Sequence, residues 1–90
     1  MIDIEFWPDY DRGPLWVDGR EVPPESLDLP ASLADRVRVW NAQYDDAKLP
    51  VGGPGDPAWL AEGRNLLREV GEALGPEYEI GANEDWWTSD

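Results

Sequence analysis

The chain of 90 residues contains no cysteine and no histidine. Without cysteine there is no disulfide, no thiolate ligand for zinc and no cysteine nucleophile. Without histidine there is no imidazole base and no triad of the serine, histidine and aspartate type. Carboxylates, tyrosines, a few hydroxyls and one lysine remain for chemistry. We therefore expect neither a metal site nor a cofactor.

Basic residues and long apolar runs are also scarce. No apolar stretch approaches the ~20 residues that span a bilayer, and the first residues lack the positive start and apolar run of a secretory signal. The chain has 20 acidic and 7 basic residues, for a formal net charge of -13. Such a charge repels nucleic-acid phosphates and anionic lipid. We expect a cytoplasmic protein that binds neither membranes nor nucleic acid directly, and whose partner is a basic protein.

The hydrophobic pattern predicts strands near both ends of the chain. Apolar and polar residues alternate over residues 2–7, which is typical of a half-buried strand. Asp18-Gly19 joins two short apolar runs and favours a hairpin with a type I′ turn. Residues 78–80 read as a last short strand.

Two amphipathic helices are predicted between these strands. The first is expected from about residue 30 to about Ala47, with Asp28, or less favourably Ser26, as its N-cap. Its buried stripe consists of Leu33, Val37, Trp40 and Tyr44.

Local signals bound the second helix at both ends. Asp56 supplies a capping carboxylate directly before Pro57, which suits the first turn of a helix. Gly75-Pro76 is expected to end it. A connection of about nine residues between the helices favours an antiparallel pair.

The order of these elements predicts an α+β fold and one domain spanning residues 1–90. We expect a small, mainly antiparallel sheet, made of the N-terminal strand, the hairpin and the C-terminal strand, packed on the antiparallel helix pair. Trp16 is expected in the core, because large aromatic side chains dominate the cores of small domains.

The acidic residues are distributed unevenly along the chain. Residues 1–30 carry a net charge of -6 and residues 77–90 carry -5, whereas residues 31–76 carry only -2. Acidic residues that serve only solubility should be spread over the whole surface, including the helices, whereas an interaction surface concentrates one sign of charge. Aromatic anchors ringed by charge are typical of protein-binding sites. The predicted partner-binding residues are Trp7, Asp9, Asp11, Asp18, Glu79, Glu84, Asp85, Trp86 and Trp87.

Two segments resemble known ligand loops but depart from them at essential positions. Asp9 and Asp11 match the start of a calcium loop, yet Gly13 replaces the third ligand and Arg20 stands where a bidentate glutamate is required. The glycine-rich segment 51–57 lacks the Lys-Ser/Thr ending of a phosphate loop, and its prolines remove amide donors. We interpret both as structural loops.

Three segments of the chain carry a family resemblance: Pro14-Leu15-Trp16-Val17, Trp40-Asn41-Ala42-Gln43-Tyr44-Asp45 and Trp59-Leu60-Ala61-Glu62-Gly63-Arg64. With them the chain resembles small acidic single-domain proteins of unknown function from high-GC actinobacteria. Proteins of this size and charge are often immunity proteins, which silence a toxin encoded beside them. The resemblance therefore implies a non-enzymatic protein-binding module, an immunity or antitoxin-type inhibitor of a basic partner.

Two alternatives from other classes remain open. Glu62, Glu69 and Glu72 line up on the second helix, and paired carboxylates serve as acid and base in some hydrolases, although a solvated helix face explains them more simply. An enzyme of this kind requires a pocket that holds at least two acids with raised pKa values. A DNA mimic that blocks a nucleic-acid-binding protein requires acids in two rows at phosphate-like spacing.

Overall fold

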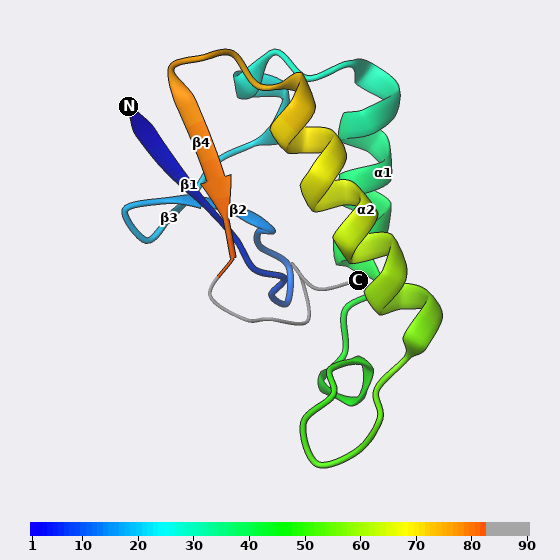
Figure 1. Ribbon diagram of the computed structural model, residues 1–90. Helices are drawn as coiled ribbons and strands as arrows, with labels where there is room; N and C mark the ends of the chain where they lie inside the picture. The colour runs from blue at the N-terminus through cyan, green and yellow to red at the C-terminus, as the bar shows by residue number, and fades with distance from the viewer. Residues whose placement is uncertain (83–90) are drawn as a thin grey trace.

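The computed structural model describes residues 1–82, which form a four-stranded sheet and two α-helices (Figure 1). β1 (Ile2–Phe6) is flanked by β2 (Leu15–Val17), which runs antiparallel to it, and by β4 (Tyr78–Gly81), which runs parallel. β3 (Arg20–Glu21) pairs with β2, so that the strand order is β3-β2-β1-β4. The predicted α+β fold with a mainly antiparallel sheet is confirmed.

Both helices lie on one side of the sheet and run antiparallel to each other (Figure 1). α1 spans Ala31–Ala42 and α2 spans Pro57–Ala73. Two short 3-10 helices, Pro24–Leu27 and Asp46–Lys48, precede α1 and follow it. Neither α-helix of the described chain has the length and apolar character needed to cross a bilayer.

The predicted hairpin turn and the predicted ends of α2 are confirmed. Asp18 and Gly19 have φ angles of 52° and 78°, both positive, as a type I′ turn requires. The Asp56 side chain accepts a hydrogen bond from the backbone N–H of Trp59 at 3.1 Å, which caps α2. α2 ends at Ala73, directly before the Gly75-Pro76 pair.

The predicted start of α1 near residue 30 is confirmed, but its predicted cap and its predicted C-terminal end are wrong. Pro30 stands at its N-terminus without a side-chain cap, and Asp28 instead ends the preceding 3-10 helix in a left-handed conformation with φ of 57°. α1 stops at Ala42 because the following backbone becomes extended at Asp45, whose carboxylate accepts a hydrogen bond from Ala47 N at 2.9 Å. Local capping by an aspartate therefore ends the helix before Tyr44, the last residue of the predicted stripe, and before the expected end near Ala47.

The core lies between the sheet and the helix pair. β1 contributes Ile4 and Phe6, which are 2% and 1% exposed and alternate with exposed acidic residues. The other main members of the core are Leu15 from β2, Val37 and Trp40 from α1, and Trp59, Leu66 and Val70 from α2.

The expectation that Trp16 belongs to this core is also wrong. Phe6 pairs with Leu15 across β1 and β2, and both side chains point toward the helices. Because successive side chains of a strand point to opposite faces, Trp16 lies on the face that the helices do not cover. Trp16 is partly exposed there, whereas Trp7 packs against the core cluster.

Candidate functional site

The sheet face that points away from the helices carries a group of exposed carboxylates around an aromatic ring. The register pairs Asp3 with Glu79, Glu5 with Trp16, and Trp16 with Glu21. Paired residues share a face, so these five side chains from all four strands lie on one surface. The four carboxylates are exposed and Trp16 is partly exposed. We call this surface, made of Asp3, Glu5, Trp16, Glu21 and Glu79, the acidic sheet face.

The parallel pairing of β1 with β4 joins the two acidic segments of the sequence. Asp3 lies directly opposite Glu79, and neighbouring strands are about 4.8 Å apart. Like charges directly opposite each other on a sheet repel and cost stability. Within residues 1–82, neither carboxylate forms an ion pair with a lysine or arginine.

Trp16 is held in one orientation on this face. Its Nε1 donates a hydrogen bond to the backbone carbonyl of Trp7 at 2.8 Å. The guanidinium carbon of Arg12 lies 5.4 Å from the centroid of the Trp16 ring, within the range of a cation–π interaction. A Cβ at Gly13 would come within 3.1 Å of the ring, so the glycine allows the preceding loop to lie against it.

A buried asparagine fixes the loop that follows β1. Asn41 of α1 is 8% exposed, donates hydrogen bonds to the carbonyls of Asp9 and Arg12 at 3.3 and 2.8 Å, and accepts one from Asp9 N at 3.3 Å. The loop holds Asp11 at φ of 58° and ends at Gly13, whose N–H donates to the Glu21 carboxylate at 2.8 Å. The loop is thus joined to the acidic sheet face at a defined geometry.

The predicted partner-binding residues are distributed over the two ends of the sheet. Asp18 occupies the hairpin turn at the end of the sheet where Asp3 and Glu79 lie, because β2 runs antiparallel to β1. Asp9 and Asp11 lie at the opposite end, in the loop after β1. Trp7, the first residue after β1, is half-buried and packs against the core cluster. Glu84, Asp85, Trp86 and Trp87 lie outside the described residues.

The sequence reasoning missed Asp3, Glu5, Glu21 and Asn41. The alternation of β1 places Asp3 and Glu5 opposite the buried Ile4 and Phe6, so the same pattern that predicted the strand also marked its polar face. Asn41 stands one turn after the buried Val37, on the apolar stripe of α1, and a polar residue at such a position signals a specific hydrogen-bond partner.

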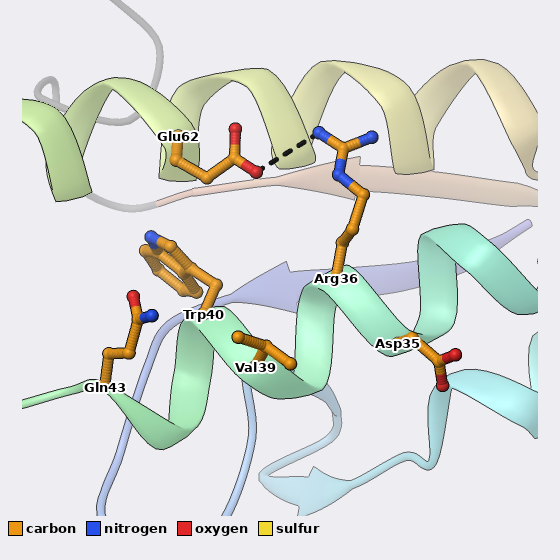
Figure 2. Close-up of a pocket in the computed structure, with 6 residues that line it drawn as sticks. All are labelled: Asp35, Arg36, Val39, Trp40, Gln43 and Glu62. Carbon is orange, nitrogen blue, oxygen red and sulfur yellow. Dashed lines mark hydrogen bonds and ion pairs between the residues drawn. The ribbon is translucent and has the colours of Figure 1, made fainter.

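Two of the three predicted glutamates of α2, Glu62 and Glu69, bond to α1, whereas Glu72 is exposed. The Arg36 guanidinium donates to both carboxylate oxygens of Glu69, at 2.9 and 2.8 Å, and to Glu62 at 3.2 Å. These hydrogen bonds raise the pKa of Arg36 and lower the pKa of Glu69. Figure 2 shows Arg36 and Glu62 at a groove that Asp35, Val39, Trp40 and Gln43 also line and that has a volume of about 260 Å³.

Glu25, Asp56 and Glu69, three carboxylates of ion pairs or a helix cap, have lowered pKa values. The hydrogen bonds from Arg38 lower the pKa of Glu25 to about 2, and the backbone N–H of Trp59 lowers the pKa of Asp56. General acids require the opposite shift. Residues 1–82 contain no cluster of three or more acidic residues suited to a metal ion.

Together these features define a small α+β protein whose distinctive feature is an exposed charged surface. A profile of the family described as Serratia CdiI immunity protein-like matches residues 2–85, and the chain belongs to this family. The match begins in β1 and continues past β4, so it includes the whole sheet and both helices. None of the curated proteins matches the chain. Membership confirms the immunity-protein-like expectation and implies that the chain binds a toxin partner.

Proposed function

We propose that this protein is an immunity protein that binds a toxin with a basic surface, in the cytoplasm, and inhibits it by covering that surface. The observation that carries the proposal is the family match over residues 2–85. The formal net charge of -13 supports the basic character of the toxin surface, because only an oppositely charged partner gains from it.

The charge also suits the kinetics that an inhibitor of a toxin needs. Opposite fields steer two proteins together and raise the association rate by orders of magnitude over neutral encounter. The effect is screened as salt rises, since the Debye length is about 10 Å at 0.1 M and about 3 Å at 1 M. Rapid capture would limit the time during which a free toxin acts.

Inhibition by binding agrees better with the described residues than catalysis does. The three carboxyl groups with shifted pKa values, those of Glu25, Asp56 and Glu69, all shift downward. Carboxylates of this kind stay ionised and hold their cations and amides, so they serve the fold. The proposal therefore needs no reaction step by this chain.

The test uses the product of the reading frame next to the gene as the candidate toxin. We expect its expression alone to arrest growth and its co-expression with this protein to restore growth, whereas an unrelated protein of similar negative charge does not. With both proteins purified, the association rate should fall by about tenfold or more as the ionic strength rises from about 0.05 to about 0.5 M. Growth arrest that this protein does not relieve, or the absence of a complex, would overturn the proposal.

A further inference from the structure

We propose that the acidic sheet face is the surface on which the toxin docks, with a patch of lysine and arginine side chains as its occupant and Trp16 as the central anchor. The inference rests on the proposed function and names the surface that carries it out. Three observations support it: the placement of the cations, the pairing of Asp3 with Glu79, and the fixed orientation of the Trp16 ring.

Most of the basic side chains with ion-pair partners lie on the helix side of the molecule. Arg36 pairs with Glu62 and Glu69. Arg38 pairs with Glu25, and Lys48 pairs with Asp56 at 3.4 Å. On the acidic sheet face, Asp3 and Glu79 form no ion pair with a lysine or arginine of residues 1–82, and Arg12 lies over the Trp16 ring. The face therefore keeps a negative field that a basic surface complements.

The pair of Asp3 and Glu79 is unfavourable in the free protein. Two carboxylates in register on neighbouring strands repel each other, and no lysine or arginine of the described chain lies in ion-pair contact with either. A lysine or arginine of a partner placed between them would turn the repulsion into two attractions. A pair that weakens the sheet but strengthens a complex is typical of residues that serve binding at some cost in stability.

Trp16 has the properties of an anchor at the centre of an interface. Its ring is partly exposed, and its hydrogen bond to Trp7 together with the Gly13 contact fixes its orientation before binding. A side chain that is already ordered loses little entropy when it is buried, so its contact area is converted efficiently into affinity. Arg12 shows that the ring accepts a guanidinium, the group that a basic partner would supply.

The groove between the helices fits a basic partner less well. Arg36 and Glu62, two of the three charged residues of its lining, pair with each other (Figure 2), and Asp35 is the third. Its floor is apolar, with Val39 59% exposed. It offers a lysine or arginine patch the single carboxylate of Asp35 outside that ion pair, whereas the acidic sheet face offers Asp3 and Glu79 in register.

The test compares two double variants that remove the same total charge. Asp3→Asn with Glu79→Gln neutralises two of the four carboxylates of the acidic sheet face, and Asp35→Asn with Glu72→Gln neutralises two exposed carboxylates of the helices. By titration with the purified toxin, we expect the first variant to bind about tenfold or more weakly, and the second within about threefold of the wild type. The melting temperature of the free first variant should rise, because a repulsive pair is removed.

Glu79→Lys separates a folding defect from a binding defect. It pairs a lysine with Asp3, so the free protein should melt at or above the wild-type temperature, while the toxin should bind still more weakly than it binds the neutral variant. Equal affinities of the wild type and both sheet-face variants would overturn the docking surface and leave the proposed function standing. A wild-type protein that does not bind the toxin would overturn both.

Discussion

The indoles of Trp40 and Trp59 stack with their ring centroids 4.3 Å apart and their planes at 8°, and each donates its Nε1 hydrogen to the backbone carbonyl of the other, at 2.8 and 3.0 Å. The two rings thus satisfy both of their polar groups while they are 2% and 4% exposed. Phe6 stacks on Trp40 at 5.2 Å, which connects the pair to β1. These contacts join α1 and α2 to each other and to β1, the strand whose other side contributes Asp3 and Glu5 to the acidic sheet face.

Replacement of Trp59 by phenylalanine should be among the most destabilising single changes. It removes the indole donor from the buried carbonyl of Trp40, which keeps its hydrogen bond from the backbone N–H of Gln43 at 3.2 Å, and it opens a cavity in the stack. We therefore expect a loss of about 2–4 kcal/mol in the free energy of unfolding. Trp16→Phe is the matched control, because it also removes an indole bond to a backbone carbonyl, but at a partly exposed site. Urea denaturation measures both variants, and equal losses would contradict the assigned role of the stack.

Asn41→Ala should loosen the loop after β1. The change removes one acceptor and two donor contacts to Asp9 and Arg12, and we expect it to cost about 1–3 kcal/mol. The backbone N–H of Asp9 should exchange with solvent faster, because its bond to the asparagine is lost. Gln43→Ala, at an exposed position directly after α1, serves as the control. Unchanged exchange at Asp9 in the first variant would refute the pinning of the loop.

Substitutions at two glycines in the loop between the helices distinguish the cost of steric contact from the cost of backbone strain. Gly52 and Gly55 have φ of 75° and 70°, but a Cβ at Gly52 meets no atom within 4 Å, whereas one at Gly55 would lie 2.5 Å from the Lys48 carbonyl oxygen. We expect Gly52→Ala to cost about 1 kcal/mol through strain and Gly55→Ala to cost more. Chemical denaturation measures the difference, and a Gly55→Ala variant as stable as Gly52→Ala would contradict the close approach.

The pairing of Glu25 with Arg38 should be visible in the pH dependence of stability. Because the folded-state pKa of Glu25 is lowered from 4.5 to about 2, the pair stabilises the protein fully above pH 4.5, and this contribution is lost as the pH falls toward 2. Glu25→Gln removes it at every pH. The difference in melting temperature between wild type and variant should therefore shrink as the pH is lowered from 6, and a constant difference would contradict the pair.

Most elements of the fold could be predicted from signals between residues close together in the sequence. The positive φ angles that Asp18 and Gly19 adopt, and the cap that Asp56 provides, depend on neighbours within a few residues, so both features could be predicted. The C-terminal end of α1 was predicted wrongly, because the apolar stripe was followed and the competing local cap at Asp45 was not recognised. Trp16 was misplaced because the size of its ring was given more weight than its alternation with Leu15.

The acidic sheet face depends on register, which no local pattern provides. Asp3 and Glu79 are far apart in sequence, and their contact follows from the parallel pairing of β1 with β4. Arg36 reaches Glu62 and Glu69 only because α1 and α2 pack antiparallel. The concentration of charge in the two end segments predicted that their carboxylates would lie together; Asp3 and Glu79 do so, but only the fold could show that these two residues meet.

Zero-length carbodiimide cross-linking of the complex is the most direct test of the account, because it joins a carboxylate only to a lysine amine in contact with it. In the mixture of this protein with the toxin, mass spectrometry should find cross-links at the carboxylates of the acidic sheet face: Asp3, Glu5, Glu21 and Glu79. High salt during the reaction should suppress them. Cross-links confined to helix carboxylates such as Asp35 and Glu72 would contradict the central claim that the open face of the sheet receives the toxin.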